Sequence, residues 1–140
     1  MPLGNSLGEY MFKVMSVRQI DLGGGQRRIE ADYAGEVTGE AGGNHYGTLS
    51  VVVRTDDDPT KPNPYSWTGT TLTTSGLIVS VTGSGLSQRT GEGHKVRLRG
   101  VCHLSTTDAR LAMLSKAIGG VEGEIDPATN TLKGVVCEWK

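Results

Sequence analysis

Apolar and polar residues alternate with a period of two along most of this 140-residue chain, and this feature constrains the fold more than any other. Successive side chains of a β-strand point to opposite faces, so the alternation predicts strands with one buried face and one solvated face. Residues 27–40 are an example, because charged residues occupy only one of their two faces. The other face holds Ile29, Ala31, Tyr33 and Val37. The pattern predicts an all-β protein.

Turns and loops divide the alternation into about eight strands. Glycine-rich turns interrupt it, and so does a loop at residues 56–64, whose prolines cannot join the interior of a ladder. The predicted strands cover residues 9–20, 27–40, 45–55, 65–74, 77–89, 94–106, 121–126 and 131–139. Most connections are short, which favours an up-and-down, mostly antiparallel order.

One segment departs from the period of two. Leu111, Leu114 and Ile118 recur at the spacing of one helical face, and a Gly-Gly pair follows them. The sequence therefore predicts one short helix near residues 108–118.

Glycine is the main compositional anomaly, with 21 of 140 residues. This is roughly twice the usual share of ~7%. Most predicted strands carry a glycine away from their ends, at Gly35, Gly47, Gly69, Gly83, Gly100, Gly123 and Gly134. Glycine weakens a flat sheet, whereas a closed barrel uses it where strands must bend. We therefore expect an eight-stranded up-and-down barrel, in one domain over residues 1–140, with residues 1–8 left open as a flexible segment. A β-sandwich with glycine-marked bulges is the alternative.

Three stretches resemble a known family. They are "DYAGEVTGEAGGNHYGTLSV", "YSWTGT" and "AIGGVEGEID...TLKGVVCEW", and the similarity spans most of residues 27–139. The chain resembles small uncharacterised bacterial proteins with an allene-oxide-cyclase-like, calycin-type β-barrel. The resemblance implies a calycin-like barrel and carries over no catalytic residue.

Composition and spacing argue against several function classes. The formal net charge of -1 does not favour nucleic acid or an anionic membrane surface as a partner. The N-terminus shows no export signal, so we expect a cytoplasmic protein in which Cys102 and Cys137 are both reduced. His45, His94 and His103 lie on separate segments without metal-ligand spacing, so we expect no metal and no cofactor.

Two polar strand faces carry charges of opposite sign. The acidic face holds Glu30, Asp32 and Glu36, and the basic face holds Lys95, Arg97 and Arg99. The opposite faces of both segments are apolar, so we expect these charges to point outward into solvent. A buried ionic cluster inside the barrel is the alternative.

The alternation of side chains between the two faces of each strand predicts which residues could bind a ligand. We expect Tyr10, Tyr33, Trp67, Cys102 and Glu138 to point into the barrel. Tyr33 and Cys102 share a face with apolar residues of their own strands, and the other face of the strand with Trp67 is too polar for a core. In the first and last strands, the sequence does not decide which of the two faces points into the barrel. The opposite choice would bury Met11 and Met15 in place of Tyr10, or Cys137 and Trp139 in place of Glu138.

Three function classes follow from a barrel with such an interior. The first is a binding protein for a small hydrophobic or amphipathic molecule. The second is a cyclase- or isomerase-type enzyme, with Glu138 or His45 as the candidate catalytic group. The third is a structural subunit of a homo-oligomer.

Overall fold

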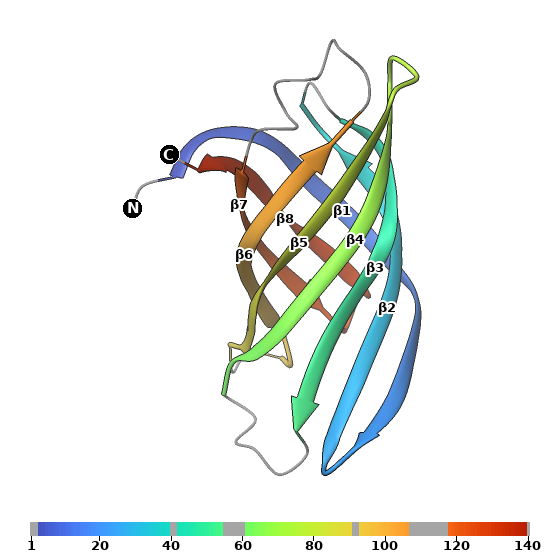
Figure 1. The fold of residues 1–140 in the computed structure, drawn as a ribbon, viewed down its shortest axis with the longest axis vertical. Coiled ribbons are helices and arrows are strands. Elements are labelled where there is room, and N and C mark those ends of the chain that lie inside the picture. Colours follow the sequence, from blue (N-terminus) through green and yellow to red (C-terminus); the bar gives the residue numbers. More distant parts are fainter. Residues whose placement is uncertain (1–2, 40–41, 55–60, 91–92, 107–117, 140) are drawn as a thin grey trace.

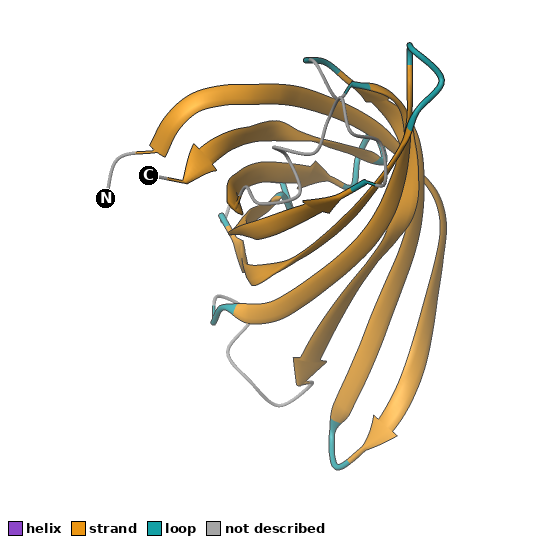
Figure 2. Ribbon diagram, turned by 45° about the horizontal axis from the view of Figure 1, so that its top comes forward, coloured by secondary structure: helices purple, strands orange, loops and turns teal. Residues whose placement is uncertain are grey.

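The computed structural model describes residues 3–39, 42–54, 61–90, 93–106 and 118–139, which form eight β-strands (Figure 1). The strands are β1 (Leu3–Gly23), β2 (Gln26–Val37), β3 (Gly43–Arg54), β4 (Asn63–Thr73), β5 (Ile78–Arg89), β6 (Val96–Ser105), β7 (Ile118–Asp126) and β8 (Thr131–Trp139). No helix occurs among these residues (Figure 2). Within the same ranges, no helix therefore has the length and apolarity that a membrane crossing requires.

The sheet closes on itself. Each strand pairs antiparallel with the next, and β1 also pairs antiparallel with β8. The predicted all-β, eight-stranded antiparallel barrel is confirmed. The sandwich alternative is excluded because the strands form one closed sheet and not two packed sheets.

Two chain segments differ from the sequence-based expectation. β1 begins at Leu3, so residues 3–8, which the sequence left open as flexible, belong to the strand and extend its pairing with β8. The helix predicted near residues 108–118 lies outside the described residues, except for Ile118, which opens β7.

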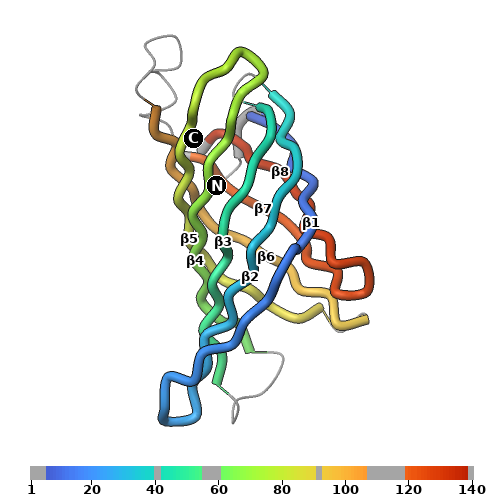
Figure 3. The backbone as a smooth tube through the Cα atoms, turned by 90° about the vertical axis from the view of Figure 1, so that its right-hand side faces the viewer, coloured from blue at the N-terminus to red at the C-terminus, as the bar shows by residue number. Residues whose placement is uncertain are grey.

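β1 is the longest strand, with 21 residues. Its pairing with β8 ends at Lys13, while its pairing with β2 continues to Gly23. A register shift between Val14 and Ser16 marks the point where the two partners diverge. Because β3 pairs with β2 along its whole length, the β1–β2 hairpin and the end of β3 together extend past the turn between β7 and β8 (Figure 3).

The core consists of side chains that point into the barrel, as the period of two predicts. All eight strands contribute at least one buried apolar residue. These residues are Tyr10, Phe12, Tyr33, Leu49, Tyr65, Val79, Val81, Leu98, Cys102, Val121 and Leu132.

Several glycines make room for aromatic side chains of neighbouring strands. Gly35 lies against Phe12, Gly47 against Tyr33, and Gly83 against Trp67. A methyl group on any of the three would lie 2.9 Å or less from that aromatic side chain, which is too close for real side chains. The sequence suggested that glycines let the strands bend. The structure adds a second reason, since each of these glycines leaves the space that a ring on the adjacent strand occupies.

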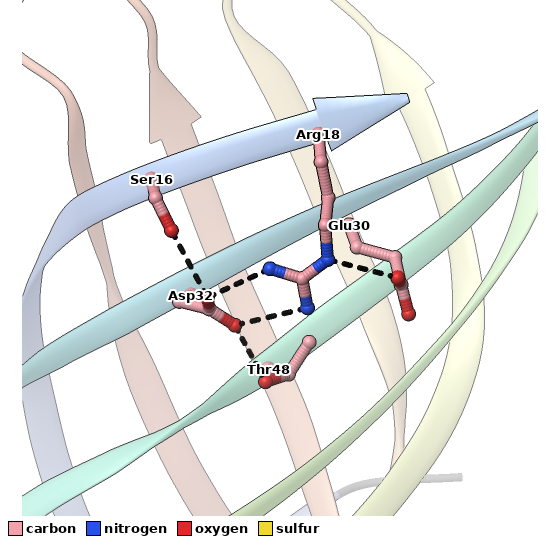
Figure 4. A network of polar contacts seen from close by, with 5 residues as sticks. All are labelled: Ser16, Arg18, Glu30, Asp32 and Thr48. Atoms are coloured by element: carbon pink, nitrogen blue, oxygen red, sulfur yellow. Dashed lines mark hydrogen bonds and ion pairs between the residues drawn. The ribbon is translucent and has the colours of Figure 1, made fainter. Parts of the chain in front are cut away.

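The acidic face of β2 points outward, as expected. Arg18 on β1 donates from Nε to Glu30 Oε1 at 3.1 Å and from Nη1 to Asp32 Oδ2 at 2.8 Å (Figure 4). The hydroxyls of Ser16 and Thr48 also donate to Asp32, at 3.0 and 2.8 Å. The hydrogen-bonded Arg18 guanidinium is the main reason that the pKa of the Asp32 carboxyl falls to about 2.

The basic residues near β6 pair with acids of β7. Arg99 Nε lies 3.7 Å from Glu122 Oε1, and Lys95 Nζ lies 4.0 Å from Glu124 Oε1. All four side chains are at least one-third exposed, so these outer-face pairs contribute little to stability. Glu30 and Asp32 thus have a different partner from Lys95 and Arg99 on the outer surface, and Glu36 and Arg97 are exposed. The alternative of one buried ionic cluster is wrong.

Both cysteines are free thiols on opposite faces of the sheet. Cys102 on β6 is fully buried in the interior, and Cys137 on β8 is half-buried on the outer side. β7 lies between β6 and β8. Two inter-strand spacings of ~4.8 Å therefore separate the two Cα atoms, which lie roughly 10 Å apart. A disulfide needs Cα atoms within ~7 Å, so this fold cannot join the two residues.

Candidate functional site

A cavity of about 440 Å³ occupies the barrel interior. It extends to the end of the barrel where β1 begins and where β2 and β8 end, because Gly8, Thr38 and Glu138 line it together with core residues. Both chain termini lie at this end (Figure 1). At the ~30 Å³ that one water molecule occupies in the liquid, the volume equals on the order of 15 water molecules. A space of this size accommodates one small organic molecule.

The two halves of the cavity wall differ in chemistry. All the rings come from β1–β4, at Tyr10, Phe12, Tyr33, His45, Tyr65 and Trp67. Strands β5–β8 contribute mainly aliphatic groups, among them Val79, Val81, Leu98, Leu104, Val121 and Val136. Among the described residues no lysine or arginine lines the cavity, and Glu138 is its one carboxylate. The cavity therefore offers an aromatic wall, an aliphatic wall and little charge.

The aromatic wall is a row of stacked rings centred on Phe12. Its ring centroid lies 5.1 Å from that of Tyr10, 4.8 Å from that of Tyr33 and 4.9 Å from that of His45, with interplanar angles of 18–28°. Trp67 approaches His45 edge-on at 6.4 Å. Aromatic pairs of this kind contribute about 0.5–1.5 kcal/mol each beyond their burial. The rings pack against glycines of neighbouring strands, so the row follows the wall and does not fill the lumen.

His45 is held at both ring nitrogens. Nδ1 lies 2.8 Å from Thr71 Oγ1, and Nε2 lies 3.3 Å from the Tyr33 hydroxyl. A hydroxyl can donate or accept, so either neutral tautomer of His45 completes both hydrogen bonds. Burial lowers the pKa of His45 to about 4, which makes the ring neutral at pH 7 and a weak proton acceptor.

The tyrosine and cysteine side chains of the cavity are also neutral at pH 7. Burial raises the pKa of Tyr65 to about 12 and that of Cys102 to about 11, and it raises the pKa values of Tyr10 and Tyr33 as well. The Tyr10 hydroxyl donates to the backbone oxygen of Glu122 at 3.1 Å. The buried Tyr65 hydroxyl lies beside Gly100 and has no hydrogen-bond partner in the described part of the chain.

The structure places every residue of the predicted ligand set on the cavity. Tyr10, Tyr33, Trp67, Cys102 and Glu138 all line it, as does the second catalytic candidate, His45. The open parities are resolved, since Tyr10 and Phe12 point inward and Met11 is 55% exposed. On β8, Val136 and Glu138 line the cavity and Cys137 does not. Whether these residues contact a ligand remains a prediction.

The predicted ligand set does not include two residues that shape the site. Phe12 has the same parity as Tyr10 on β1, and it is the centre of the ring row. Thr71 holds His45 and is 3% exposed. The parity of Trp67 could have found it, because Thr71 lies four residues further along the same strand and so shares the interior face.

The described part of the chain contains no group of three or more His, Cys, Asp or Glu side chains that could hold a metal ion. The described histidines are dispersed, since His45 is in the cavity while His94 and His103 are exposed.

Two solved structures share this fold. A protein of unknown function from Clostridium acetobutylicum ATCC 824 matches with a TM-score of 0.74 and 17% identity, over 96% of this chain and 98% of that chain. A conserved protein of unknown function from Rhodopseudomonas palustris matches with a TM-score of 0.77 and 15% identity, over 95% of this chain and 94% of that chain. No family model and no curated protein matches the sequence. At these identities the similarity shows the fold alone.

Proposed function

We propose that this protein binds one small, uncharged, mostly apolar molecule inside the barrel. The observation that carries the proposal is the cavity of about 440 Å³, which remains open beside a row of stacked rings. An eight-stranded barrel can be filled entirely by side chains, as many small barrels are. Here the rings pack against glycines along the wall, and this arrangement supports a binding role over a purely structural core.

The charge of the ligand follows from the lining. A buried charge is costly unless an opposite charge pairs with it. Among the described residues no cation lines the cavity, and the one carboxylate there, Glu138, would repel an anion. An anionic ligand therefore has no partner in the described part of the cavity, whereas an uncharged ring system can stack on Phe12 and Tyr33.

Two fluorescent probes test this proposal. N-phenyl-1-naphthylamine is uncharged, and 8-anilino-1-naphthalenesulfonate has the same rings with one added sulfonate. We expect the uncharged probe to bind with at least about tenfold higher affinity, corresponding to ~1.4 kcal/mol. Binding should quench or shift Trp67 emission, and Trp67→Phe should remove most of that response. A protein that binds neither probe and carries no co-purified molecule by native mass spectrometry would contradict the proposal.

A second candidate function is a cyclase- or isomerase-type reaction that uses Glu138. The observation that favours it is that this carboxylate lines the cavity, where it could handle a proton of a bound substrate. The allene-oxide-cyclase-like relationship suggested by the sequence belongs to the same proposal. Glu138→Gln separates the two functions. It should abolish turnover of the co-purified molecule by an enzyme, and it should leave the affinity of a binding protein nearly unchanged.

A further inference from the structure

The second half of β1 has a neighbouring strand on one side only. β8 accompanies β1 as far as Lys13, and the backbone N–H of Val14 donates to Asn130 O at 2.8 Å. Beyond this point β1 continues to Gly23 with β2 as its partner (Figure 3). Within the described residues, the backbone from Met15 to Leu22 therefore presents an edge with no strand against it.

This edge lacks several of the features that keep strand edges apart. Proteins usually protect an edge with lysine, proline, a β-bulge or a charge that points inward. Register shifts lie at the two ends of the segment, between Val14 and Ser16 and between Asp21 and Gly23, and the edge from Ser16 to Asp21 is regular. The segment from Met15 to Leu22 contains no lysine and no proline. Its one cation, Arg18, is bound to Asp32 and Glu30 on the outer face of β2. Met15 is 70% exposed and Val17 is 59% exposed, so apolar side chains accompany the unpaired backbone.

We propose that two copies of this chain associate through this edge, with β1 antiparallel to β1 of the second copy about a two-fold axis. Antiparallel pairing about such an axis is self-complementary, because the same residues supply donors and acceptors on both sides. Any other strand partner would need its own matching edge, whereas a second copy always provides one.

Charge selects a register for this pairing. A two-fold axis at Val17 places the two Val17 side chains together and sets Arg18 of each copy opposite Ser16 of the other. Ser16 is uncharged, so each Arg18 keeps its pair with Asp32 of its own chain and meets no like charge across the axis. An axis at Arg18 would instead place two guanidinium groups opposite each other.

Light scattering after size-exclusion chromatography tests the proposal on the full chain. The wild type should have the mass of two chains. Val17→Lys puts a charge at the axis and should raise the dimer dissociation constant by at least about tenfold. Leu86→Lys is the matched control, since Leu86 is 54% exposed on β5, which has neighbours on both sides. This control should remain a dimer, and both variants should keep the circular dichroism of the wild type.

Cysteine substitutions report the register directly. In a Cys137→Ser background, Val17→Cys should form an intermolecular disulfide under mild oxidation faster than Ile20→Cys, because only a residue near the axis meets its own copy. A wild type that is monomeric at every concentration overturns the proposal. A dimer that survives Val17→Lys and forms no Val17→Cys cross-link also overturns it, because the contact then lies elsewhere.

Discussion

The indole ring of Trp67 on β4 covers Gly83, its cross-strand partner on β5. A methyl group on Gly83 would collide with three atoms of that ring. A methyl group on Gly35 would likewise meet the Phe12 ring, and one on Gly47 would meet the Tyr33 hydroxyl, in both cases together with backbone atoms of a neighbouring strand. Because the glycine has no side chain, the aromatic side chain of the neighbouring strand can lie against it. The glycine therefore sets the position of the aromatic side chain.

Gly83→Ala should force the Trp67 ring toward the lumen. We expect a loss of roughly 1–3 kcal/mol in the free energy of unfolding, together with weaker binding of N-phenyl-1-naphthylamine. Urea denaturation of Gly83→Ala, Trp67→Leu and the double variant measures the coupling between the two sites. Gly83→Ala should lower the free energy of unfolding by clearly less in the Trp67→Leu background than in the wild type. Equal costs in both backgrounds would show that the ring does not depend on this glycine.

The buried His45 should make stability depend on pH. Its folded-state pKa is about 4 and its ordinary value is 6.5, so only the unfolded chain binds a proton between these values. Above about pH 6.5 the neutral His45 costs nothing in the free energy of unfolding. As the pH drops to about 4, this free energy falls by up to about 3 kcal/mol, because the unfolded chain gains the proton. Urea denaturation at both pH values should show a smaller difference for His45→Gln. His103→Gln, on the exposed outer face, is the control and should behave as the wild type does.

Tyr65 and Tyr10 should respond differently to the loss of their hydroxyls. The Tyr65 hydroxyl is buried without a partner among the described residues, so Tyr65→Phe should leave thermal stability unchanged or raise it. The Tyr10 hydroxyl donates to Glu122 O, so Tyr10→Phe should cost about 0.5–1.5 kcal/mol. Differential scanning calorimetry compares the two variants. A Tyr65→Phe variant as destabilised as Tyr10→Phe would mean that the Tyr65 hydroxyl does have a partner.

The two cysteines should differ in reactivity toward iodoacetamide. Cys102 is fully buried, and its pKa of about 11 lies two units above the ordinary 9.0. Its thiolate fraction at neutral pH is therefore about 100-fold smaller than that of an ordinary cysteine, and the restricted access of the reagent to a buried thiol slows the reaction further. Mass spectrometry should find one label, on Cys137, in the native protein and two labels after unfolding. A mass two daltons low with no label after unfolding would indicate a disulfide.

Much of the fold could be predicted because the relevant signal is local. The alternation around Tyr33, Trp67 and Cys102 identified their inward faces, since the opposite faces of those strands carry charged or hydroxyl groups. The row of rings could not be predicted in the same way. Phe12, Tyr33 and His45 are distant in sequence, and they meet only because the register aligns Phe12 with Gly35 and Gly35 with His45.

The sequence by itself determined that this chain forms about eight strands, and it determined which face of most of them is buried. Both depend on a period of two that each strand carries within itself. The tertiary structure alone decided the parity of the first and last strands, because Tyr10 and Met11, or Val136 and Cys137, are apolar neighbours on opposite faces. It also decided that the barrel retains a cavity, since Phe12, Tyr33 and Trp67 pack along the wall against glycines of neighbouring strands.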